Sequence, residues 1–92
     1  MTEFDKFVYL MINSKIPVVD TSKYGGINFT YTNDGEHRTA RLIKDKLVID
    51  VNETDNNWFR MFRLLEVYKN GTYMGLQSAD GAFRIIKEAL SK

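Results

Sequence analysis

Apolar side chains recur every three or four residues near the start of the chain, at Phe4, Phe7, Val8 and Met11. This spacing predicts one apolar stripe on an amphipathic helix. Thr2 is suited to the N-cap position, and Asp5 three residues later forms an approximate capping box with it. Because Pro17 disfavours the α conformation in the residue before it, we expect the helix to end around residues 14–16.

The next three segments show the pattern of strands. In residues 27–32 apolar and polar side chains alternate, so Ile27, Phe29 and Tyr31 would point to one face of a sheet. Turn residues at 33–35 and 45–46 separate this strand from two more, at about 37–44 and 47–51. Connections this short require antiparallel neighbours, so the sequence predicts a meander.

Residues 58–69 fit two interpretations. The spacing of Trp58, Met61, Phe62, Leu65 and Tyr68 is compatible with a helix. The alternative is a strand from about residue 61 to 69, a turn at Asn70-Gly71 and a returning strand over 72–76. We favour the hairpin, because Asn-Gly between aromatic and β-branched flanks is a strong hairpin signal.

The chain ends with a second predicted helix. Ser78 is its expected N-cap, and its apolar face comprises Ala82, Ile85, Ile86, Ala89 and Leu90. The sequence therefore predicts one α+β domain over residues 1–92. We expect a single antiparallel sheet of about four to five strands, with an N-terminal and a C-terminal helix packed on one face.

Composition narrows the class of protein. The 92 residues include no cysteine, which removes disulfide and thiol chemistry, and no apolar run long enough to span a membrane. The N-terminal residues have no basic start of a signal peptide, so we expect a cytoplasmic protein. The formal net charge is +1, well below that of most nucleic-acid-binding domains.

Groups suited to catalysis are scarce. His37 is the single histidine, and no nucleophile is paired with it in the sequence. The acids Asp50, Glu53 and Asp55 lack the glycine and terminal glutamate of a calcium loop, and Gly25-Gly26 lacks the spacing of a phosphate loop. We therefore expect no enzyme, no metal and no cofactor.

Aromatic and arginine side chains are interleaved in the segment Trp58-Phe59-Arg60-Met61-Phe62-Arg63. One strand or helix face cannot bury six consecutive residues, so part of this segment is expected at the surface. Tryptophan, arginine and phenylalanine are typical of protein interfaces. The leading hypothesis is a non-enzymatic protein-binding adaptor, inhibitor or regulator that uses Trp58, Phe59, Arg60 and Arg63. The same segment is also compatible with core aromatics beside solvated arginines.

Nucleic-acid binding through the open sheet face is the alternative hypothesis. Arg38, Arg41, Arg60 and Arg63 would contribute to it, although the spacing of Arg38 and Arg41 places these two on opposite faces of a strand. A small-ligand binder or enzyme is the third. A short sheet has exposed edges, which favours a homodimer.

The stretch Phe62-Arg63-Leu64-Leu65-Glu66-Val67-Tyr68-Lys69-Asn70-Gly71, continued through Met74-Gly75 to the last helix, has a recognisable order of hairpin and helix. In shape it resembles the carboxy-terminal part of the three-stranded DNA-binding domains of plant transcription factors and phage integrases. Those domains read the major groove with the sheet. The resemblance covers about a third of the chain. The leading helix, the extra strands and the near-neutral charge depart from it, and no residue role follows from it.

Overall fold

The computed structural model describes residues 2–16, 27–34, 37–44, 47–54 and 64–91. Two helices, α1 (Glu3–Asn13) and α2 (Ala79–Leu90), stand before and after five strands. The strands are β1 (Ile27–Asp34), β2 (His37–Lys44), β3 (Leu47–Glu53), β4 (Leu65–Lys69) and β5 (Thr72–Gln77). They form one antiparallel sheet, which confirms the predicted α+β fold.

The sheet is a meander, because the order of its strands in space is their order in the chain. Asp34 pairs with His37, and Lys44 pairs with Leu47, so two residues join each pair of strands. The first connection is shorter than the sequence predicted. Asn33 and Asp34 were expected in a turn, but both continue β1 through their pairing with β2.

The hairpin interpretation is confirmed for residues 65–77, and the helical one is wrong for residues 65–69. Asn70 and Gly71 have φ angles of 51° and 81°, as required by a two-residue turn that matches the twist of a hairpin. Lys69 and Thr72 pair across this turn. The part of the predicted strand at 61–63 lies outside the described residues.

A capping box begins α1, as the sequence predicts. Thr2 Oγ1 accepts a hydrogen bond from the Asp5 amide at 3.1 Å, and the Asp5 carboxylate accepts from the Thr2 amide at 3.3 Å. The helix ends in a left-handed turn at Lys15, whose φ is 60°. There the Ile16 amide donates to the Met11 carbonyl at 2.9 Å, which is the pairing of a Schellman motif. The helix itself ends at Asn13 with Ser14 as its C-cap, and the turn extends to Ile16, the residue before Pro17.

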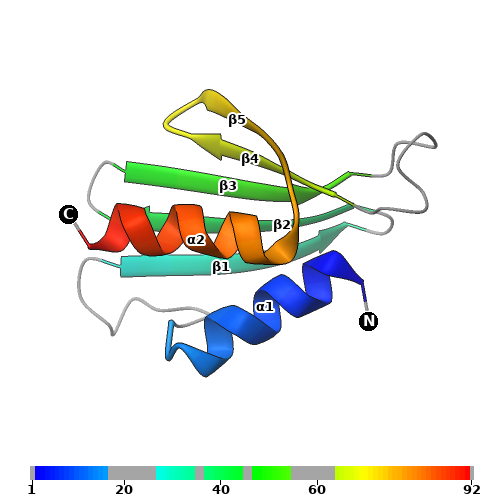
Figure 1. The fold of residues 1–92 in the computed structure, drawn as a ribbon, viewed down its shortest axis with the longest axis horizontal. Helices are drawn as coiled ribbons and strands as arrows, with labels where there is room; N and C mark the ends of the chain where they lie inside the picture. Colours follow the sequence, from blue (N-terminus) through cyan, green and yellow to red (C-terminus); the bar gives the residue numbers. More distant parts are fainter. Residues whose placement is uncertain (1, 17–26, 35–36, 45–46, 55–63, 92) are drawn as a thin grey trace.

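Both helices cover the same face of the sheet (Figure 1). The core between them and the sheet contains Phe4, Phe7 and Met11 of α1 and Ala79, Ala82, Ile86 and Ala89 of α2. From the sheet it contains every second residue, namely Phe29, Ala40, Leu42, Ile49, Val51, Leu65 and Val67. Tyr31, predicted on the same face as Phe29, has its ring centroid 5.6 Å from that of Phe4.

The two helices also meet directly at the N-terminus of α2. Ser78 caps this helix, since its hydroxyl accepts from the Gly81 amide at 3.2 Å. Glu3 of α1 adds a second acceptor, because its Oε2 lies 2.7 Å from the Ala79 amide. A carboxylate at this position also suits the positive end of the α2 dipole. The two helices are thereby joined to each other as well as packed on the sheet. Among the described residues, no helix covers the opposite face of the sheet.

Candidate functional site

The uncovered side of the sheet, here called the open face, consists of the strand residues that alternate with the core. Cross-strand pairing arranges them in rows. The longest row contains Thr30, Arg41, Asp50, Tyr68 and Tyr73. The row beside it contains Thr32, Thr39, Asn52, Glu66 and Leu76, and a short third row contains Ile43 and Val48.

Tyrosine and aliphatic side chains occupy part of the open face. The rings of Tyr68 and Tyr73 lie 5.1 Å apart at an angle of 48°, within the range of favourable aromatic pairs. Tyr73 is 50% exposed. Partial desolvation and the negative charge of Glu66 raise the pKa of the Tyr73 hydroxyl above its usual value. Ile43 and Val48 are half-buried and pair with each other in the short third row, next to Arg41 and Asp50 of the longest row.

Gly75 shapes the edge of the open face. Its φ of 94° lies in the region that favours glycine. The pairing between β4 and β5 shifts at this point, because Tyr73 opposes Tyr68 but Leu76 opposes Glu66. The extra residue of this bulge keeps both Tyr73 and Leu76 on the open face, and Gln77 lies against α2 near Gly81.

Arg41 lies on the open face in an ion pair with its cross-strand neighbour Asp50. Its Nε donates to Oδ1 of Asp50, and its Nη2 lies 3.5 Å from Oδ2. This hydrogen bond raises the pKa of Arg41. The side chain of Arg41 is 53% exposed. The ion pair therefore has no net charge, and it remains partly exposed to water.

Arg38 lies on the other face, beneath the N-terminus of α1. Its Nε donates to Glu53 at 3.0 Å, its Nη2 donates to the Thr2 hydroxyl at 2.6 Å, and its Nη1 donates to Asp5. The guanidinium carbon also lies 4.8 Å from the centroid of the Phe4 ring. Burial opposes the charge of Arg38, but the hydrogen bonds to Glu53 and Asp5 outweigh it and raise its pKa. The Arg38 side chain is only 18% exposed.

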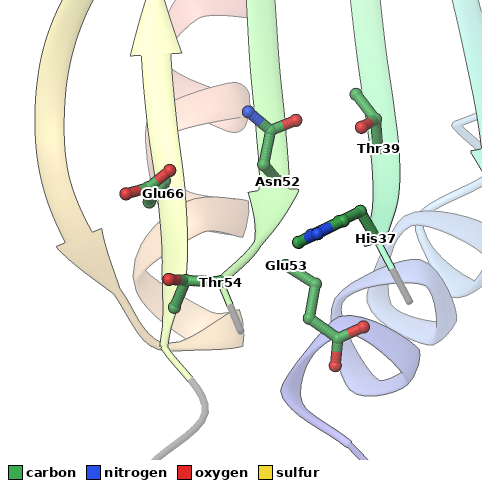
Figure 2. A pocket seen from close by; sticks show the side chains of 6 residues that line it. All are labelled: His37, Thr39, Asn52, Glu53, Thr54 and Glu66. Atoms are coloured by element: carbon green, nitrogen blue, oxygen red, sulfur yellow. The ribbon is translucent and has the colours of Figure 1, made fainter. Parts of the chain in front are cut away.

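A pocket of about 390 Å³ lies on the open face, where β2 and β4 begin and β3 ends. Figure 2 shows the side chains of His37 and Thr39 from β2, Asn52 from β3, Thr54 just after it and Glu66 from β4. Glu53 also lines it, although its carboxylate is directed toward α1 and accepts from Arg38 (Figure 2). We call this set the polar pocket.

The polar pocket adjoins the part of the chain that the sequence singled out. The Thr54 amide donates to the Leu64 carbonyl at 3.4 Å, so the chain leaves and re-enters the sheet at neighbouring positions. Residues 55–63 connect these two points. Trp58, Phe59, Arg60 and Arg63 therefore belong to a connection that starts and ends beside the pocket, and they themselves lie outside the described residues.

The other candidate residues are separated by the sheet. Arg38 and Arg41 point to opposite faces, as their spacing predicted, and each contacts a carboxylate. Asp50 and Glu53 are likewise divided between the two faces, and Asp55 and Gly25-Gly26 lie outside the described residues. No group of three or more potential metal-binding His, Cys, Asp or Glu side chains occurs in the described part of the chain.

Sequence reasoning did not name Thr39 or Glu66 as candidate site residues. It considered Asn52 only beside a weak cation motif and Thr54 only as a possible helix cap. The alternation of residues 37–44 and 47–53 contained the signal for Thr39 and Asn52, because both fall between core positions. Glu66 could not be assigned to a face while helix and strand remained open for its segment. Their proximity follows from the register of three strands.

Fold and site together define a small α+β domain with one face covered by helices and one face open. No protein-family model, curated protein or solved structure matches this chain. In the parts of the chain that the structure describes, neither helix is long and apolar enough to cross a membrane.

Proposed function

We propose that this chain is a non-enzymatic module that binds another protein through the open face. The observation that supports it is the composition of that face among the described residues. Tyrosines, threonines and aliphatic side chains dominate it, and it has no lysine, since Lys44 and Lys69 fall in register with core positions. Protein interfaces are enriched in tyrosine and arginine and depleted in lysine.

Charge on the open face also favours a protein over a nucleic acid. Its described ionised groups are Arg41, Asp50 and Glu66, which sum to a charge of −1. Binding to phosphates requires an excess of positive charge. Of the four arginines in the nucleic-acid hypothesis, Arg38 contacts α1 and Arg41 is paired with Asp50. Arg60 and Arg63 lie outside the described residues. The alternative therefore receives less support than protein binding.

The segment with Trp58, Phe59, Arg60 and Arg63 is part of this proposal, because it joins the sheet at Thr54 and Leu64 beside the polar pocket. A partner on the open face at the polar pocket would lie beside Thr54, where this connection begins. The predicted cytoplasmic location is also retained as part of the proposal.

Self-association is a second candidate, supported by the edge of the sheet. β1 is an edge strand of eight residues, Ile27–Asp34, without lysine, arginine or proline, the residues that commonly protect an edge. By contrast, the other edge strand, β5, has a bulge next to Gly75. Light scattering over a range of protein concentrations tests the homodimer, and a constant monomer mass at every concentration would contradict it.

Selection of peptides from a random dodecamer phage library tests the proposed surface. The matched variants are Tyr73→Ala on the open face and Tyr9→Ala on α1, which remove tyrosines that are 50% and 56% exposed. We expect the selected peptides to lose about tenfold in affinity for Tyr73→Ala and to keep it for Tyr9→Ala. Thermal unfolding verifies that both variants are folded.

Equal affinity for wild type and Tyr73→Ala across all selected peptides would contradict protein binding by the open face. Titration of labelled random-sequence DNA and RNA at low and near-physiological salt tests the alternative. Strong binding that weakens steeply with salt would favour nucleic acid instead.

A further inference from the structure

The polar pocket contains a charge that the described residues leave uncompensated. Glu66 forms no ion pair within the described part of the chain. Its cross-strand neighbours, Asn52 and Leu76, are neutral. In the adjoining row the carboxylate of Asp50 already accepts from Arg41, and on the other face Glu53 accepts from Arg38. Glu66 is therefore the one unpaired carboxylate among the described residues of the open face.

A protein that covers the open face would remove water from Glu66. A buried carboxylate without a counter-charge is strongly unfavourable. A bound partner must therefore leave Glu66 solvated, bind it in its protonated form or supply a positive charge. The pocket of about 390 Å³ gives room for a side chain to enter.

The neutral groups of the pocket are suited to the same kind of side chain. Thr39 and Thr54 contribute hydroxyls, and Asn52 contributes an amide oxygen (Figure 2), all of which accept hydrogen bonds. A guanidinium has five donors and binds a carboxylate with two of them. The remaining donors could reach these neutral acceptors, whereas a carboxylate or an apolar side chain would leave Glu66 unpaired.

We infer that the partner inserts a basic side chain, arginine or lysine, into the polar pocket beside Glu66. This inference rests on the proposed function and adds the chemistry of the partner's contact. It places the attachment point at the β2–β3–β4 end of the sheet, next to the connection that contains Trp58 and Arg63.

The peptides selected on the wild-type protein also test this inference. We expect one arginine or lysine to be shared among those that Tyr73→Ala weakens. Their affinity should fall about tenfold for Glu66→Gln and should be unchanged for Glu88→Gln, which removes the same charge from the exposed surface of α2. Replacing the shared basic residue with citrulline or norleucine should weaken wild-type binding equally, with no further loss in Glu66→Gln.

A charge exchange makes the test specific for contact. Glu66→Arg should reject the basic peptide and bind a version in which glutamate replaces its basic residue. Peptides that are sensitive to Tyr73→Ala but bind wild type and Glu66→Gln equally would overturn this inference and leave the proposed function standing. Peptides insensitive to both variants would overturn both.

Discussion

Arg38 and Arg41 are three residues apart on one strand, yet they have different physical roles. Arg38, on the helix-covered face, contacts Thr2, Asp5, Glu53 and the ring of Phe4. Arg41, on the open face, has one carboxylate partner and is half exposed to water. The first joins α1 to the sheet, and the second balances a charge. Counting basic residues would treat the two alike, whereas the face of the sheet decides which of them is available to a partner.

The largest difference between the two faces is expected in the free energy of unfolding that is lost when an aromatic side chain is truncated. Phe7 is fully buried between α1 and the sheet, and truncation of a buried phenylalanine leaves a cavity. We expect Phe7→Ala to lower the free energy of unfolding by about 3–5 kcal/mol. Tyr73→Ala on the open face should lower it by about 1 kcal/mol or less. Urea denaturation of both variants measures the contrast, and equal losses would show that the open face is also part of the core.

The second-largest difference in the free energy of unfolding is expected between variants of Arg38 and Arg41. Arg38→Ala removes three hydrogen-bonded contacts and leaves Glu53, only 9% exposed, without this partner. We expect a loss of about 2–3 kcal/mol. Arg41→Ala removes an exposed pair and should cost about 0.5 kcal/mol or less. Arg38→Lys is the matched control, because it keeps the charge but not the planar fork, and it should recover only part of the stability. Similar losses for Arg38→Ala and Arg41→Ala would refute the distinction between them.

A smaller effect is expected at the bulge that shapes the open face. Gly75 has a φ of 94°, and its added Cβ would meet Gln77 only at an ordinary contact distance of 3.6 Å. Backbone strain is therefore the main cost, and Gly75→Ala should lose about 1 kcal/mol. Hydrogen exchange of the β5 backbone amides provides a second readout, since these amides should exchange faster if the bulge is lost. An unchanged free energy of unfolding would show that the bulge tolerates a side chain.

The smallest effect is the dependence of stability on pH through Asp5. A hydrogen bond from Arg38 holds the pKa of the Asp5 carboxyl below its usual value, against the opposing effect of burial. A lowered folded-state pKa adds stability above the unfolded pKa near 4, and this contribution is lost as pH falls through the folded value. Asp5→Asn should therefore be less stable than wild type at neutral pH, and the difference should shrink as pH falls through the lowered folded-state pKa of Asp5.

Denaturant curves at a series of pH values, with Arg38→Met and the double variant, complete this test. In the Arg38→Met background, Asp5→Asn should change the pH dependence of the free energy of unfolding much less than it does in wild type. A pH-dependent difference that persists in the Arg38→Met background would show that another group sets the pKa of Asp5.

Local signals were sufficient for most of the fold. Thr2, Asp5 and Ser78 cap the helices where the sequence placed them, because capping depends on residues within three positions. The Asn70-Gly71 turn resolved the ambiguous segment in favour of a hairpin. Leu65 fits both periods in sequence, and only its pairing with β3 decides between them. The left-handed turn at Lys15 had no such signal, because lysine rarely adopts a positive φ.

The candidate site was less predictable than the fold. Sequence reasoning selected Arg38 and Arg41 for their charge, but it could not assign partners that come from other elements. Glu66 received no attention, because its importance depends on Asn52 and Leu76 being neutral and adjacent to it. The Trp58–Arg63 segment stays a prediction, since it lies outside the described residues.

The sequence by itself determined the two helices, the first three strands and which residues of those strands alternate between the two faces. These depend on short-range periodicity, capping and turn conformation, which a few neighbouring residues specify. Only the tertiary structure decided which charges are compensated. Arg38 meets Asp5 and Glu53 across separations of 33 and 15 residues, and the pocket around Glu66 forms from three strands in register. Because electrostatic pairing depends on distance in space, the chain order alone does not reveal it.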